Sequence, residues 1–165
     1  MKRKKVLFVC LGNICRSPSA EAVMKKLVKR EGLENIIEVD SAGTIDYHEG
    51  EPADERMQKH AKKRGYELNH TAKVFDTKTD FRKADYIVTM DNDNYYDITS
   101  FDKGNHHSDK IFKLSQFAGD IKFEEVPDPY DGGPEGFEIV LDILEDACKG
   151  LLEKIENDIK YNHQE

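Results

Sequence analysis

The spacing of apolar residues along this chain predicts strands and helices in turn. Short continuous apolar runs are typical of buried parallel strands. The predicted strands cover residues 6–9, 36–40, 84–90 and 110–114. Apolar residues three and four apart are typical of amphipathic helices. The predicted helices cover residues 17–31, 54–64, 76–83, a short stretch around 95 and a long stretch from 134. We expect residues 160–165 to form a frayed tail.

Turn-forming and capping residues mark the ends of these elements. Ser17 and Pro18 suit the N-cap and first position of the first helix, and Gly32 suits its end. Residues 41–43 predict a turn, and residues 125–133, with two prolines and two glycines, predict a loop. Strands that alternate with helices predict an α/β domain with a parallel sheet. Such sheets bind ligands where their strands end, so we expect the chemistry in the loop after the first strand.

Length and composition exclude several classes of protein for this chain. The chain has 165 residues, a net charge of −8 and no apolar run near the roughly 20 residues of a membrane span. The acidic balance argues against a nucleic-acid binder, and recurring apolar residues argue against a disordered chain. One domain over residues 1–165 is therefore expected. Three cysteines are an odd, low number that suits a reducing compartment, so we expect a cytoplasmic location.

The segment from Cys10 to Ser17 carries the clearest chemistry. It joins a buried strand to a helix N-terminus, where inward N–H groups and the helix dipole attract an oxyanion. Those N–H groups belong to Leu11, Gly12, Asn13, Ile14 and Cys15. We expect Gly12 and Asn13 to take unusual backbone dihedrals. Arg16 would place two N–H groups on two phosphate oxygens. Cys10 would ionise readily in this field and attack phosphorus, and the Ser17 hydroxyl would stabilise its thiolate.

Expelling an alcohol from a phosphate ester also needs a general acid. Asp128 lies between Pro127 and Pro129, which stiffen the loop and would hold its carboxyl in place. The sequence contains neither G-x-x-x-x-G-K-[ST] nor G-x-G-x-x-G, so no nucleotide cofactor is expected. The adjacent His106 and His107 are more typical of a solvated loop than of a metal site, so no metal is expected either.

These residues stand in segments that resemble the low-molecular-weight protein tyrosine phosphatases over nearly the whole chain. The matching segments are V-L-F-V-C-L-G-N-I-C-R-S-P-S at 6–19, D-S-A-G at 40–43, A-D-Y-I-V-T-M-D at 84–91 and D-P-Y at 128–130. The resemblance implies a flavodoxin-like three-layer sandwich with a central four-stranded parallel sheet and a phosphate-binding loop after the first strand. It also implies a protein-tyrosine-phosphatase that works without metal. Cys10 would attack phosphorus, Arg16 would bind its oxygens, and Asp128 would act as acid and then as base.

The resemblance assigns supporting functions to further residues. Asn13, Ser41 and His70 are expected to hold the loop in shape. Asp91 is expected either to orient the loop or to cap the next helix. In many members a cysteine at the position of Cys15 protects the oxidised nucleophile by forming a disulfide. The alternative for Cys15 is a buried thiol that fills space.

The expected partner is a phosphotyrosine-containing protein, and the loop would also hold phosphate or another oxyanion. A phosphotyrosine ring needs a slot with apolar or aromatic walls. The candidates for these walls are Leu11, Ile14, Tyr47 and Tyr130. Each of them could instead be an ordinary packing residue. We expect a monomer or weak dimer that binds no nucleic acid.

Three other functions fit parts of the sequence. An arsenate reductase on this scaffold would need more cysteines after Lys73, and residues 73–97 contain none. The protein-arginine phosphatases tend to carry a threonine where this chain has Ile14. A phosphate-dependent binding module without turnover would have lost part of the catalytic set, which is present. An active phosphatase with an acidic pH optimum is therefore expected, since Cys10 must be ionised while Asp128 is protonated.

Overall fold

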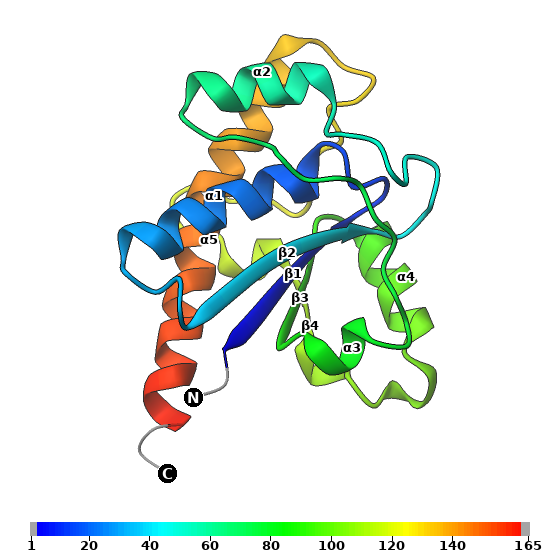
Figure 1. Ribbon diagram of the computed structural model, residues 1–165, viewed down its shortest axis with the longest axis vertical. Coiled ribbons are helices and arrows are strands. Elements are labelled where there is room, and N and C mark those ends of the chain that lie inside the picture. Colours follow the sequence, from blue (N-terminus) through cyan, green and yellow to red (C-terminus); the bar gives the residue numbers. More distant parts are fainter. Residues whose placement is uncertain (1–2, 163–165) are drawn as a thin grey trace.

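The computed structural model describes residues 3–162 and contains one parallel sheet with helices on both faces (Figure 1). The strands are β1 (Lys4–Cys10), β2 (Ile37–Gly43), β3 (Tyr86–Thr89) and β4 (Ile111–Lys113), in the order β2-β1-β3-β4 across the sheet. The helices are α1 (Arg16–Arg30), α2 (Glu55–Lys63), α3 (Asp80–Lys83), α4 (Asn92–Phe101) and α5 (Pro134–Asn162). Short 3₁₀ helices are η1 (Lys103–Asn105), η2 (Ser108–Lys110) and η3 (Leu114–Phe117). The predicted four-stranded parallel sheet is confirmed.

Strand β1 lies inside the sheet, and its side chains alternate between the two faces. Val6 and Phe8 belong to an apolar cluster with residues of α1 and α5. Leu7 and Val9 belong to a second cluster, with residues of α3 and α4 on the other face. Helices therefore cover both faces, as Figure 1 shows. This explains why the strand is a continuous apolar run rather than an alternating one.

Two predicted element ends beside the first strand are wrong. Helix α1 begins at Arg16 with Cys15 as its N-cap, so Ser17 is not the cap. The Ser17 side chain turns toward the loop instead. Strand β2 continues through Gly43, where a turn was predicted, because Gly43 is the register partner of Cys10 in β1. Parallel pairing with β1 thus lengthens a segment whose composition alone is typical of a turn.

Two other predicted ends also differ from the structure. Helix α3 starts at Asp80, so residues 76–79 of the predicted helix lie outside it. Residues 160–162 belong to α5, so the prediction of a frayed tail is wrong for them, and 163–165 lie outside the described residues. The remaining predicted strands and helices are present. None of the helices in residues 3–162 is both long and apolar enough to cross a membrane.

Charged side chains fix α2 and the chain that follows it against α5. Arg64 lies 2.8 Å from Glu138 and 2.9 Å from Asp142, and it also pairs with Glu145. Burial lowers the pKa of Arg64, but hydrogen bonds to these carboxylates outweigh burial and raise it. The Tyr66 hydroxyl donates to Glu145 at 2.8 Å. The end of α2 is thereby anchored at several points.

Candidate active site

The chain between β1 and α1 forms a tight loop that ends at a helix N-terminus (Figure 1). Asn13 has a φ of 59°, a left-handed conformation that asparagine tolerates better than most residues. Gly12, also predicted to need an unusual conformation, has no positive φ. Its small size matters instead, because a Cβ there would lie 2.9 Å from Cδ2 of His48. A Cβ on Gly43 would similarly lie 2.7 Å from the carbonyl oxygen of Leu11. The segment after β2 therefore encloses the loop closely.

The buried side chain of Asn13 holds the loop from inside. Its Nδ2 donates to Oγ of Ser17 at 2.8 Å and to Oγ of Ser41 at 2.9 Å. Its Oδ1 accepts from the backbone N–H of Lys73 at 3.0 Å. His70 Nε2 donates to the carbonyl oxygen of Asn13 at 2.7 Å. The structure thus brings Ser41 and His70, which lie far along the chain, against the loop.

Ser17 connects this hydrogen-bond network to Cys10. The Sγ of Cys10 lies 2.9 Å from the Oγ of Ser17. Because the Ser17 oxygen already accepts from Asn13, its hydroxyl proton is free to donate to the sulfur. A donor in this position stabilises a negative sulfur.

Arg16 is buried, and three groups orient its guanidinium. Nη1 donates to Asp91 at 2.6 Å and to the carbonyl oxygen of Val126 at 3.1 Å. Nη2 lies 3.6 Å from Oδ2 of Asp128. Burial lowers the pKa of Arg16, but the charge of an ionised Cys10 and the hydrogen bond to Asp91 raise it above its ordinary value. A permanent positive charge therefore lies beside the Cys10 sulfur.

Asp91 performs both of the functions between which the sequence left a choice. Its Oδ2 orients Arg16, and its Oδ1 accepts from the backbone N–H of Asn94 at 2.8 Å. Asn94 Oδ1 accepts in return from the backbone N–H of Asp91 at 3.2 Å, which completes a capping box at the start of α4. The helix cap therefore also fixes the carboxylate that holds the arginine.

The loops that follow β2 and η3 enclose a pocket of about 230 Å³ above this loop. Cys10, Arg16 and Asp128 all line it. The residues predicted as walls also line it: Leu11, Ile14, Tyr47 and Tyr130. The predicted supports Ser41 and His70 do not line it, because they contact the loop from behind.

Asp128 stands at the entrance of the pocket with 48 % of its side chain exposed. Its Oδ1 accepts from the backbone N–H of Tyr130 at 3.1 Å. The centre of the Tyr130 ring lies 5.3 Å from the guanidinium carbon of Arg56. Nη2 of Arg56 in turn donates to Oδ2 of Asp54 at 2.9 Å. Tyr47, in contrast, is 78 % exposed. The Tyr130 wall is thus packed against Arg56, whereas the Tyr47 wall is open to solvent.

A buried cysteine sulfur, a buried arginine and a carboxylate surround a loop at a helix N-terminus, a place that suits an anion such as a phosphate group. The family described as "Low molecular weight phosphotyrosine protein phosphatase" matches residues 5–161. The chain belongs to this family. It is therefore a phosphatase, as predicted.

Relatives and solved structures agree with the family assignment. A putative low molecular weight protein-tyrosine-phosphatase of Synechocystis is 47 % identical over 148 residues, covering 90 % of this chain and 94 % of the relative. A protein tyrosine phosphatase of Entamoeba histolytica, solved with Hepes in its active site, superposes with a TM-score of 0.89 at 50 % identity. That alignment covers 94 % of this chain and 98 % of the other. A Drosophila arginine phosphatase superposes with a TM-score of 0.84 at 34 % identity, over 92 % and 97 % of the two chains.

Sequence reasoning missed His48 and Glu21 at this site, and it also missed Ile45 and Asp131, which line the pocket. His48 lines the pocket, 4.8 Å from the Tyr47 ring, and its Nδ1 lies 2.7 Å from Glu51. Glu21 is buried behind the loop and accepts from the Ser41 hydroxyl at 2.6 Å. Glu21 lies next to the apolar face of α1, and a carboxylate at the edge of a buried face could have indicated a polar partner inside the protein. Nothing in the sequence around His48 pointed to the pocket beyond its neighbour Tyr47.

The three cysteines of the phosphatase are free and buried. Burial, together with the charge of Asp54, raises the pKa of the Cys15 thiol. Burial likewise raises the pKa of Cys148, which lies in the core on α5. A protective disulfide between Cys10 and Cys15 stays a prediction. Within residues 3–162, no three His, Cys, Asp or Glu side chains are placed to share a metal ion.

Proposed function

We propose that this phosphatase hydrolyses phosphotyrosine in proteins through a phosphocysteine intermediate. The observation that carries the proposal is the convergence of Cys10, Arg16 and Asp128 on one pocket of about 230 Å³. Residues 5–161, which match the family, act as one catalytic domain. Phosphate or another oxyanion occupies the same loop.

In the first step, the Cys10 thiolate attacks phosphorus in line with the tyrosyl oxygen. The P–S bond forms while the bond from phosphorus to the tyrosyl oxygen breaks. The protonated carboxyl of Asp128 gives its proton to the leaving oxygen. Arg16 and the loop N–H groups bind the three remaining phosphoryl oxygens and stabilise their charge. Asp91 supports this step because it fixes the direction of the guanidinium.

In the second step, a water molecule attacks the phosphocysteine. The Asp128 carboxylate accepts a proton from this water as the new P–O bond forms. The P–S bond breaks and the electron pair returns to Cys10, where the Ser17 hydroxyl stabilises the thiolate. Inorganic phosphate leaves. Asp128 is again protonated, by the proton that it took from water, and Cys10 is again a thiolate, so the cycle is closed.

Phosphoarginine is the second candidate substrate, because a similar chain is named an arginine phosphatase. Ile14 favours phosphotyrosine, since it adds an apolar side chain to the pocket wall against which an aromatic ring packs. The cytoplasmic location and the monomeric or weakly dimeric state stay predictions.

The experiment that tests the proposal compares initial rates of phosphate release from phosphotyrosine, phosphoserine and phosphoarginine peptides of one sequence. Wild type and Cys10→Ser are measured side by side. We expect rapid release from phosphotyrosine alone, and none from the variant, which still binds the peptide. A preference for phosphoarginine would contradict the assignment made from Ile14. Binding without turnover in the wild type would contradict the proposed chemistry.

The pH profile provides a second test. The scheme requires a thiolate on Cys10 and a proton on Asp128 in the same molecule, so the rate should depend on pH and should fall as the pH rises toward about 8 and Asp128 loses its proton. A rate that stays flat from about pH 4 to about pH 8 contradicts the general-acid step.

A further inference from the structure

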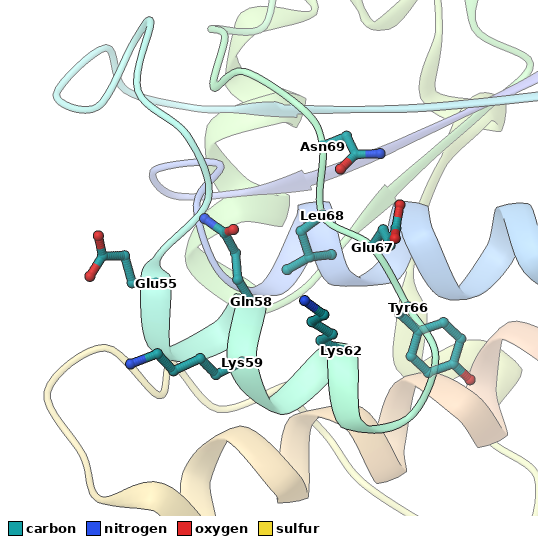
Figure 2. A pocket seen from close by; sticks show the side chains of 8 residues that line it. All are labelled: Glu55, Gln58, Lys59, Lys62, Tyr66, Glu67, Leu68 and Asn69. Atoms are coloured by element: carbon teal, nitrogen blue, oxygen red, sulfur yellow. The ribbon is translucent and has the colours of Figure 1, made fainter.

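A groove of about 500 Å³ lies beside α2 (Figure 2). It is separate from the catalytic pocket of about 230 Å³. Helix α2 forms one wall and the segment 66–69 forms the other. The two pockets have no lining residue in common. A volume of this size falls in the range of small-molecule sites.

The groove has a preformed apolar base. Leu68 is buried and belongs to the apolar cluster that includes Met57 and Ala61 of α2. The hydroxyl of Tyr66 is held by Glu145 at 2.8 Å, so its ring stays in place. A ligand with a flat or aliphatic body therefore finds an ordered apolar surface here without rearranging the chain.

Two lysines and two glutamates, Glu55 and Glu67, line this groove in a protein whose net charge is −8. Lys59 and Lys62 line the groove, and neither ammonium has an ion pair or hydrogen bond with another residue in the described part of the chain. Figure 2 shows the Lys62 side chain reaching between the walls toward Leu68, whereas Glu55 points away from it. Lys26 lies outside the lining; its ammonium sits 4.9 Å from the centre of the Tyr66 ring and donates to the carbonyl oxygen of Gly65 at 3.5 Å. An anionic group between the walls would meet the Lys62 ammonium, which has no partner among the described residues.

Both walls of the groove connect directly to the phosphate loop. The backbone N–H of Asp54, just before α2, donates to the carbonyl oxygen of Ile14 at 2.9 Å. His70, just after the other wall, donates to the carbonyl oxygen of Asn13 at 2.7 Å. Leu68 also belongs to the same apolar cluster as Ile14. A change in the spacing of the walls therefore changes the position of the loop carbonyls.

We propose that this groove binds a small organic anion, and that its occupation alters the phosphate loop. The anionic group pairs with Lys62, and the ring or aliphatic body covers Leu68 and Tyr66. Carboxylates and phosphate monoesters share this chemistry. The effector differs from the substrate, and binding at the groove does not depend on the proposed activity.

The test uses 1-naphthoate as the probe and ¹⁵N-labelled full-length chain. Inorganic phosphate is added only to the concentration that fills the catalytic loop, which keeps the probe out of that loop; phosphate has no apolar body to cover Leu68 and Tyr66. We expect saturable changes in the amide shifts of residues 58–69, followed by smaller changes at Asn13 and Ile14. Lys59→Glu combined with Lys62→Glu should weaken binding about tenfold, as the loss of a charge pair of about 1.4 kcal/mol implies. The matched control is Lys122→Glu with Lys160→Glu, which changes the net charge equally at exposed sites elsewhere and should bind as wild type.

Several results would overturn the inference. Shifts confined to residues 10–17 and 128–131 would mean that the probe binds only in the catalytic pocket. Equal affinities in the two double variants would mean that the lysines do not bind the anion. Shifts in the groove without any at Asn13 and Ile14 would disprove the coupling. If the charge reversals prevent folding, Lys59→Gln with Lys62→Gln replaces them. Because the shifts need no turnover, failure of the proposed phosphatase reaction would leave this test intact.

Discussion

Replacing Asn13 by alanine tests how the phosphate loop keeps its shape. Asn13 is fully buried, has a φ of 59° and makes three side-chain hydrogen bonds. At about 1 kcal/mol for each hydrogen bond, their loss costs about 3 kcal/mol. Alanine also disfavours the left-handed conformation by about 1 kcal/mol. We therefore expect Asn13→Ala to lower the free energy of unfolding by about 4 kcal/mol.

Two further variants separate these contributions. Asn13→Gly loses the same hydrogen bonds but accepts a positive φ without strain, so it should be about 1 kcal/mol more stable than Asn13→Ala. Asn105 is the other non-glycine residue with a positive φ among the described residues, at 56°, and it is exposed. Asn105→Ala should therefore lose only the conformational part, about 1 kcal/mol.

Urea unfolding at pH 7 measures these differences. With an m-value of about 2 kcal/mol/M, the midpoint of Asn13→Ala should fall by about 2 M. Added phosphate gives a second readout, because a ligand at about 100 times its Kd stabilises a protein by about 2.7 kcal/mol. This stabilisation should disappear in both Asn13 variants. If Asn13→Ala unfolds within about 0.3 M of wild type, or still gains stability from phosphate, the reasoning is refuted.

The remaining predictions concern the acid, one close contact and one buried thiol. Asp128→Asn should reduce kcat for a phosphotyrosine peptide by about 10²–10³-fold. The loss should be smaller for para-nitrophenyl phosphate, because its leaving group needs less protonation. Equal losses for the two substrates would argue against Asp128 as a general acid. Gly150→Ala should lower thermal stability by about 1–3 kcal/mol, despite the better helix propensity of alanine, because a Cβ would collide with the backbone oxygen of Phe117. Gly132→Ala, whose Cβ would lie 3.7 Å from its nearest neighbour, is the control. Burial raises the pKa of Cys148, so the unfolded chain releases its proton first and stability should fall as the pH rises above about 8.5. That fall, measured as urea midpoints at pH 7.5 and 10, should be smaller in Cys148→Ala; an equal fall would exclude the thiol as a cause.

Much of the fold follows from local patterns in the sequence. The apolar runs located all four strands, and the three-and-four spacing located the main helices. The segment from Cys10 to Ser17 could be interpreted as an anion-binding loop because all of its parts are close in the sequence. The elements could be predicted because side chains repeat with the period of the backbone. The loop could be predicted because its residues follow one another in the sequence.

The errors arose where tertiary contacts override local preference. Residues 41–43 have the composition of a turn, but pairing with β1 makes them a strand. Ser17 has the composition of a helix cap, but the buried Asn13 recruits its hydroxyl. For residues 41–43 the deciding partner is a strand more than thirty residues away, and for Ser17 it is a buried side chain of the same loop.

The sequence by itself determined the strand–loop–helix unit, its Cys10 and Arg16, and the alternation that makes a parallel sheet. Only the tertiary structure decided what meets that loop. It brought Val126 and Asp128 to Arg16, placed His48 and Glu21 at the site, and left a groove beside α2. The physical reason is that backbone geometry and side-chain size determine the conformation of residues that are close in the sequence. The approach of segments 110 residues apart depends instead on which faces of the sheet and helices bury their apolar surface together.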